Sequence, residues 1–218
     1  MNKEKRASQF GRSMIEMLGV LAIIGVLSVG GISGYTEAMR KYKMTKTIEI
    51  VRASLFRLME INQMKHGGYE WINSVDLYVA TGLLPEEICD KDYVDAWGTT
   101  GDACQLPLGE IVMNLGFSDG MPMSGQYSIT FTDGDKERNC VDFLSYHWEK
   151  ITPKDWWASE RGGVLSVYSD DTDVYIYTGN KEYGEQYNLP TELTMDNIAK
   201  SCHQYCGDTV CGVGMRFR

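Results

Sequence analysis

The longest uncharged segment of the sequence runs from Met17 to Tyr35 and reads MLGVLAIIGVLSVGGISGY, nineteen residues without a charged side chain. A helix of this length is long enough to cross the hydrocarbon core of a bilayer. A cleaved secretory signal has a shorter apolar core and is followed by a small-residue cleavage site, whereas this run passes directly into a charged helical pattern. We therefore expect the segment to be retained as a membrane-spanning helix.

The same helix is predicted to continue beyond the membrane. Apolar residues recur there in alternating steps of four and three, which places them on one helix face. They are Met44, Ile48, Val51, Leu55 and Leu58. The first strong helix breaker is the pair Gly67-Gly68, so we expect one helix from about Ser13 to Lys65, roughly 80 Å long. Because the apolar stripe lasts only two heptads, packing against the chain's own globular part is favoured over a coiled coil.

Charge divides the chain into two unlike parts. Residues 1–66 carry 11 Lys and Arg against 5 Asp and Glu, whereas residues 67–218 carry 10 against 25. The acidic part would repel nucleic-acid phosphates and anionic lipid head groups, so we expect no nucleic-acid partner for it. A length of 218 residues fits one compact domain with an additional helix.

All cysteines lie in the acidic part of the chain. They are Cys89, Cys104, Cys140, Cys202, Cys206 and Cys211. An even count without a CxxC pair is typical of a disulfide framework formed in an oxidising compartment. We therefore expect a cytoplasmic N-terminus and residues 36–218 outside the cytoplasm. A zinc site that combines His203 with three of these cysteines is disfavoured, because spacings of four and five fit no usual ligand pair.

One carboxylate interrupts the apolar start of the helix. Glu16 lies within Met14-Ile15-Glu16-Met17-Leu18, and a carboxylate in hydrocarbon costs on the order of 3 kcal/mol or more unless it finds a partner. Glu16 either extends to the membrane interface, one turn away, or requires a cation. The residues alone leave both interpretations open.

The segment from Gly11 to Leu27, GRSMIEMLGVLAIIGVL, resembles the N-terminus of type IV pilins and of the related pseudopilins of type II secretion. In that family a prepilin peptidase cleaves after the Gly that ends a short basic leader, and the new N-terminal residue is methylated. The resemblance makes Arg12 the first mature residue and Glu16 the fifth, where the family has a Glu. The family's first mature residue is usually apolar, and Arg12 departs from this pattern.

The resemblance also implies a partner for Glu16 and a life cycle for the chain. In assembled filaments of the family, the carboxylate of the fifth residue faces the N-terminal amine of a neighbouring subunit, and this charge pair selects the register. The implied partners are other copies of the chain, the prepilin peptidase, the membrane and the inner-membrane assembly machinery. The chain would cross the inner membrane once before assembly and then enter an extracellular pilus or a periplasmic pseudopilus. We expect no cofactor and no metal.

The remaining sequence predicts an antiparallel sheet. Alternating or apolar runs separated by Gly and Asp clusters occur at 110–115, 126–132, 163–168, 174–178 and 209–217. A short helix is expected from Ser74 to near Gly82, with Val75, Tyr78 and Val79 facing inward. The expected fold class is thus α+β, with a long N-terminal helix packed on an antiparallel sheet domain that contains disulfides, as in type IV pilins.

We expect four segments in this fold. They are a leader (1–11), an apolar transmembrane or filament-core helix (12–35), its amphipathic continuation (36–66) and a globular domain (67–218).

Short body motifs, Ala96-Trp97-Gly98 and the run from Tyr127 to Thr132, are similar to those of the longer type IVb pilins. Six cysteines allow 15 pairings. The resemblance favours Cys140 with Cys202, and Cys89–Cys104 and Cys206–Cys211 would then close local loops.

Other patterns have structural explanations that we favour. The run from Gly116 to Gly120 matches GxSxG, but a nucleophile elbow must open a helix, which the following Met121–Gly125 cannot easily do. Two acidic clusters could hold calcium, but neither continues as an EF-hand loop, so solvated hairpins are favoured. These clusters are Asp133/Asp135/Glu137 and Asp170/Asp171/Asp173.

An aromatic cluster could form a sugar-binding or adhesive surface, although core packing or contact with a neighbouring subunit is the more frequent use. It consists of Tyr146, Trp148, Trp156 and Trp157. The histidines His66, His147 and His203 are too scattered to define a site. We therefore expect a non-enzymatic, structural filament subunit. The alternatives are a type II secretion pseudopilin or, from another class, a membrane-anchored periplasmic enzyme or binding protein.

Overall fold

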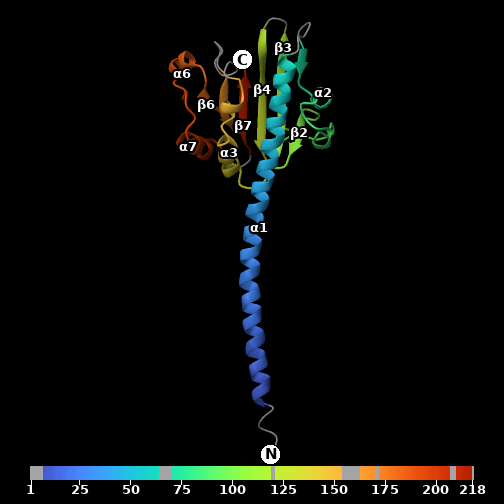
Figure 1. The fold of residues 1–218 in the computed structure, drawn as a ribbon, viewed down its shortest axis with the longest axis vertical. Coiled ribbons are helices and arrows are strands. Elements are labelled where there is room, and N and C mark those ends of the chain that lie inside the picture. The colour runs from blue at the N-terminus through green and yellow to red at the C-terminus, as the bar shows by residue number, and fades with distance from the viewer. Residues whose placement is uncertain are drawn as a thin grey trace, which may run out of the picture. The chain divides into compact units, whose positions relative to one another are not determined.

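The computed structural model describes residues 7–63, 70–118, 121–153, 163–169, 172–206 and 210–217. The chain divides into two compact units, Met1–Tyr42 and Lys43–Arg218. One helix, α1 (Ala7–Gln63), contributes to both of them (Figure 1). The expected long N-terminal helix is therefore present, and it begins before Ser13, the residue at which the sequence pattern placed its start.

The first unit consists of the apolar part of α1. Every residue from 16 to 36 is exposed, and the exposed fraction of Val26 reaches 75%. The hydroxyls of Ser28 and Thr36 donate to the carbonyls of Ile24 and Ser33 at 2.7 and 2.9 Å. These hydroxyls are thus satisfied within the helix itself. By length and composition, the helix could cross a membrane.

The second unit is built on one antiparallel sheet. Its strands are β1 (Glu70–Ile72), β2 (Ala103–Leu106), β3 (Gly109–Ser118), β4 (Met121–Phe131), β5 (Val164–Tyr168), β6 (Asp173–Thr178) and β7 (Cys211–Phe217). The strand order is β1-β3-β4-β7-β5-β6, and β2 pairs with β3 beside β1. The five strand segments expected from the sequence correspond to β3, β4, β5, β6 and β7, so the α+β fold class is confirmed.

The second half of α1 covers one face of this sheet. Val51, Leu55 and Leu58 are fully buried, and the Oγ of Ser54 lies 2.9 Å from the Oη of Tyr127 on β4. Figure 1 shows this part of α1 running alongside β3 and β4. The apolar stripe is therefore covered by the chain's own sheet, as its two-heptad length indicated.

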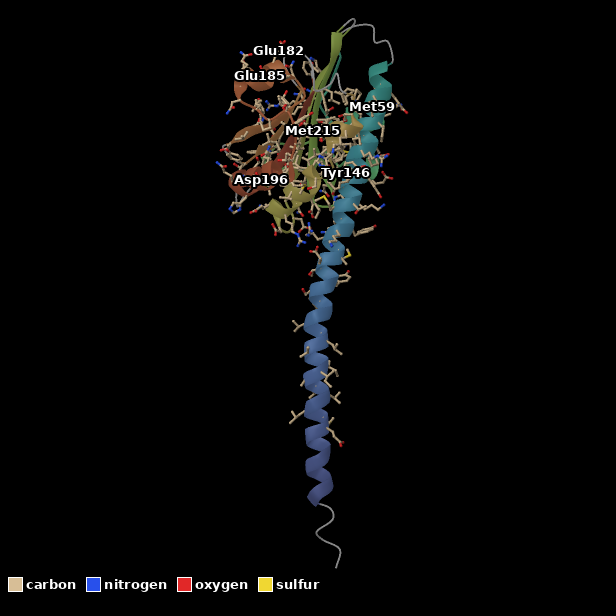
Figure 2. All side chains as sticks on the ribbon, turned by 60° about the vertical axis from the view of Figure 1, so that its left-hand side comes forward. Met59, Tyr146, Glu182, Glu185, Asp196 and Met215 are labelled. Atoms are coloured by element: carbon tan, nitrogen blue, oxygen red, sulfur yellow. A yellow bond between two sulfur atoms is a disulfide. The ribbon has the colours of Figure 1, made fainter. Side chains whose placement is uncertain are left out.

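Short helices surround the sheet. They are α2 (Val75–Ala80), the 3-10 turn η1 (Glu86–Ile88), α3 (Lys136–Leu144), α4 (Trp148–Ile151), α6 (Lys181–Tyr187) and α7 (Met195–Tyr205). Asp135, Asn180 and Thr194 cap α3, α6 and α7, because each side chain accepts a hydrogen bond from a backbone N–H of the first turn. Helix α2 follows Ser74 as expected, although this serine makes no side-chain cap. Figure 2 shows Glu182 and Glu185 on α6 and Asp196 on α7 at the outside of the unit, away from α1.

Three disulfides link these elements to one another and to the sheet. Cys140 on α3 is bonded to Cys202 on α7, across 62 residues of sequence. Cys89 is bonded to Cys104 on β2, and Cys206 after α7 is bonded to Cys211 at the start of β7. No cysteine is free. These are the pairs that the sequence analysis favoured, and the first of them closes the longest loop.

A tyrosine hydroxyl fills a gap in the sheet edge. Strand β2 pairs with residues 109–112 of β3 and β1 pairs with residues 115–117, which leaves Met113 between them. The Tyr78 hydroxyl donates to the Met113 carbonyl at 2.6 Å and accepts from the Met113 N–H at 3.0 Å. Burial raises the pKa of Tyr78 to about 12, so the hydroxyl remains protonated at neutral pH. Tyr78 therefore completes the hydrogen bonding of β3 between its two short partners.

We expect Tyr78→Phe to lower the free energy of unfolding by about 2 kcal/mol, since a buried backbone N–H and C=O would lose their partner. Tyr187→Phe is the matched control, because Tyr187 is 54% exposed. Chemical denaturation of the detergent-solubilised chain, followed by circular dichroism, measures both variants. Equal stability of the two would show that the hydroxyl does not support β3.

Candidate functional site

The predicted processing and assembly residues all lie on α1. Gly11 and Arg12 belong to its helical backbone, and Glu16 is an exposed residue of the first unit. No Lys or Arg occurs between residues 16 and 39, and the next cations, Arg40 and Lys41, are paired with Glu37. At 1.5 Å per residue, Arg40 lies roughly 36 Å along the helix from Glu16. A cation for Glu16 must therefore come from its N-terminal side or from another chain.

The exposed part of α1 has the features of a surface that packs against other helices. A Cβ atom added at Gly19, Gly25, Gly30, Gly31 or Gly34 would meet no atom within 4 Å. Gly30 and Gly34 form a GxxxG pair, a spacing that allows close approach between apolar helices. Large apolar side chains such as Leu21 and Leu27 stand beside them, 62% and 68% exposed. The first unit thus offers both bulky and small residues for helix packing or for lipid.

The first acidic cluster takes part in structural contacts. The Lys43 ammonium pairs with Asp133, and Asp135 accepts a hydrogen bond from the Arg138 N–H at 3.0 Å as the cap of α3. The Glu137 carboxylate lies 3.1 Å from the Nδ1 of His203. Each of the three carboxylates therefore has a partner in the protein. The expected solvated hairpin is wrong, because these residues connect β4 to α3 and cap the helix.

Two members of the second acidic cluster, Asp170 and Asp171, lie outside the described residues. Its third member, Asp173, pairs with Arg216 on β7.

The GxSxG run also extends beyond the described residues at Asp119 and Gly120. Its described part, residues 116–118, ends strand β3, and β4 follows from Met121. A strand rather than a helix follows this motif, which is not the setting of a nucleophile elbow.

The aromatic cluster is used in the core where it is described. Trp148 is fully buried, and its indole N–H donates to the Phe143 carbonyl at 2.9 Å. The ring centroids of Tyr146 and Trp148 lie 4.8 Å apart. Trp156 and Trp157 lie outside the described residues, as does His66. The two described members of the cluster therefore form no exposed sugar-binding surface.

The cysteine-rich C-terminal segment brings three sulfur atoms close together. The Sγ atoms of Cys140, Cys206 and Cys211 all lie within 4.8 Å of one another. Each of them belongs to a disulfide, so none is a thiolate that could bind a metal. The three sulfur atoms are therefore close because the Cys140–Cys202 and Cys206–Cys211 disulfides pack side by side where α3, α7 and β7 meet.

A buried carboxylate that the sequence analysis did not single out organises the loop before β2. Glu110 on β3 is fully buried, and its Oε2 accepts from the Tyr93 hydroxyl at 2.9 Å. Its Oε1 accepts from the Ala96 N–H at 2.9 Å. The available signal was one charged residue at an alternate position within an apolar strand. Glu110 thus anchors this loop to the sheet through two hydrogen bonds to a charged acceptor.

No protein-family model, curated protein or solved structure matches the chain.

We expect Glu110→Gln to loosen the loop before β2. The amide oxygen can still accept from the Ala96 N–H, and its NH2 group would donate to the Tyr93 hydroxyl, but both bonds lose the charge of the acceptor and weaken by about 1 kcal/mol each. Hydrogen exchange of residues 90–102 should become faster in this variant. Glu60→Gln is the control, because the Glu60 carboxylate is exposed and pairs with Arg57 in an i,i+3 ion pair. Unchanged exchange in Glu110→Gln would contradict this role of Glu110.

Proposed function

We propose that the chain is a structural subunit of a type IV pilus or a related filament, processed after Gly11 and assembled through its N-terminal helix. The observation that carries the proposal is a single helix with two different surfaces. Residues 16–36 are exposed and almost entirely apolar, whereas Val51, Leu55 and Leu58 of the same helix are buried on the sheet. A soluble enzyme has no use for an apolar helix that its own domain leaves uncovered.

Membrane anchoring alone explains the apolar surface but not the carboxylate within it. A simple anchor would be more stable with an apolar residue in place of Glu16, since an unpaired carboxylate in hydrocarbon is costly. A filament subunit has a use for it, because a neighbour's N-terminal amine would be its cation. Charge pairs at the start of each helix would then fix the axial register of the subunits.

The charged residue at the proposed first mature position also has a use in this scheme. Arg12 precedes Glu16 by four residues in α1, the spacing at which side chains of opposite charge interact on a helix. Before assembly, the Arg12 guanidinium would reduce the cost of holding Glu16 in the membrane. On assembly, the carboxylate would exchange this partner for the amine of another subunit, or bind both.

The proposal also covers location and partners. The chain would be inserted in the inner membrane with its N-terminus in the cytoplasm, where the prepilin peptidase removes residues 1–11. The second unit, with its three disulfides, would lie in the oxidising compartment. Assembly machinery in the inner membrane would then transfer the subunit to an extracellular pilus or a periplasmic pseudopilus.

Processing gives the first test. In a host with a prepilin peptidase, mass spectrometry of the mature chain should find an N-terminal peptide that begins at Arg12 and carries a methyl group. Gly11→Val should retain the leader, and Gly19→Val, which lies beyond the site, should be processed normally. A mature chain that begins at any other residue would contradict the proposed leader.

Assembly gives the second test. We expect Glu16→Gln to remain in the membrane at normal levels while filament yield falls about tenfold or more, since breaking one side of a buried charge pair costs about 3–5 kcal/mol. Glu49→Gln is the matched control on the same helix, because Glu49 is exposed and pairs locally with Lys46. Sheared filaments are quantified by immunoblotting against the membrane fraction. Normal filament yield from Glu16→Gln would refute the role of this carboxylate.

A further inference from the structure

An open pocket lies on the face of the sheet opposite to α1. Its volume is about 540 Å³, which falls in the range of small-molecule sites. The floor is strand β4, whose alternate residues face the two sides of the sheet. Tyr127 and Ile129 point into the core beneath α1, whereas Gln126, Ser128 and Thr130 line the pocket. The pocket is therefore floored by polar side chains.

The loop before β2 places the Trp97 indole at the edge of the pocket. Trp97 lines the pocket and is 50% exposed, in contrast to Trp148, which is fully buried in the core. Asp95 accepts hydrogen bonds from the N–H groups of Trp97 and Thr99 at 2.9 and 2.7 Å. Glu110 holds the preceding residue, Ala96, from the sheet below. The Trp97 backbone is thus fixed before any ligand arrives, which lowers the entropic cost of binding.

The opposite wall is shaped by a glycine. The ring of Tyr168 on β5 lies across Gly212 of β7, where an added Cβ would come within 2.2 Å of its Cζ atom. The Tyr168 hydroxyl lies 2.8 Å from the Oγ1 of Thr130 in the pocket floor. Any larger residue at 212 would clash with this ring. Gly212 therefore permits the position of Tyr168 in the pocket lining.

The lining chemistry selects among ligands. It combines one exposed aromatic ring with hydroxyl and amide groups, an arrangement that matches an apolar ring face and equatorial hydroxyls. Asp95 and Asp102 add negative charge, whereas Asp173 is paired with Arg216, which also donates to Gln126 at 3.0 Å. The described residues that line the pocket themselves include no Lys or Arg. Anionic ligands such as sialylated, sulfated or phosphorylated sugars are thus disfavoured by charge.

We propose that this pocket binds a neutral pyranose ring of a glycan, stacked on Trp97 and hydrogen-bonded by Gln126 and Ser128. The binding site follows from the geometry of the second unit, and its placement on a filament rests on the proposed function. In a filament with α1 at its core, the sheet face opposite α1 points outward. The subunit would then carry an adhesive site for a cell-surface or matrix polysaccharide.

The test uses the full chain in a polyoxyethylene detergent, because glycoside detergents would compete for the pocket. Saturation-transfer NMR is recorded with the methyl glycosides of galactose, glucose and mannose, with N-acetylglucosamine and with N-acetylneuraminic acid, each at millimolar concentration. We expect transfer to at least one neutral sugar and weaker transfer to N-acetylneuraminic acid. Trp97→Ala should lower the affinity about tenfold or more, because it removes the stacking surface.

Two further variants show whether a loss of sugar binding comes from a change in the pocket or from unfolding of the domain. Trp71→Ala removes another half-exposed tryptophan outside the pocket lining and should leave binding unchanged. Ser128→Tyr should abolish binding by filling the pocket from its floor while keeping a residue suited to a strand. Intact circular dichroism of each variant shows that the domain remains folded.

Three results would overturn the inference. They are the absence of transfer to every neutral sugar, equal binding by Trp97→Ala and the parent chain, and preferential binding of N-acetylneuraminic acid. Filament formation by the parent chain, measured beside its saccharide binding, separates this inference from the proposed function. Saccharide binding without filaments would support the site and reject its placement on a pilus, whereas normal filaments without saccharide binding would reject the site alone.

Discussion

The packing of one helix against one sheet face determines how the rest of the structure is arranged. Val51, Leu55 and Leu58 of α1 are fully buried, and their burial contributes about 1.5–3 kcal/mol for each side chain. The opposite sheet face carries Gln126, Ser128 and other polar residues. The exposed apolar half of α1 and the half that packs on the acidic domain belong to one continuous helix. The chain can therefore place its two surfaces in different solvents without a hinge of glycine or proline between them.

Several carboxylates of the acidic domain stabilise its loops and helix ends through hydrogen bonds and ion pairs. Glu110 and Asp95 hold the loop before β2, Asp133 pairs with α1 through Lys43, and Asp135 caps α3. Such contacts consume part of the negative charge of residues 67–218, but many acidic side chains on the outer helices remain in solvent. Like-charged domains repel one another at short range, although salt screens this effect beyond about 8–10 Å. If the chain polymerises, the attraction must then come from the uncharged helix and the repulsion from the domains, an arrangement that favours spaced domains around a tightly packed core.

The sequence predicted the long helix and strands β3 to β7, because these elements have clear periodicity and lie between Gly and Asp turns. It did not predict β1 and β2, which have three and four residues and depend on pairing with β3. Helices α3 and α7 were also missed, since their buried faces amount to a few residues such as Phe143 and Ile198. Their caps, Asp135 and Thr194, were the available signal. The N-terminal site of Gly11, Arg12 and Glu16 came from a contiguous motif, whereas the pocket joins residues near 97, 128 and 170 that only the folded sheet brings together.

The two sheet faces differ in how much sequence change each can accept. On the α1 side, a polar substitution at Leu55 or Ile129 would bury an unpaired group within the core, so this face is constrained by folding. On the other side, Trp97 is half exposed, and its backbone N–H donates to the Asp95 carboxylate, which holds the loop at this residue. The exposed part of the Trp97 ring can therefore contact a ligand. We expect substitutions at Trp97 to leave the packing of α1 on the sheet and the three disulfides unchanged.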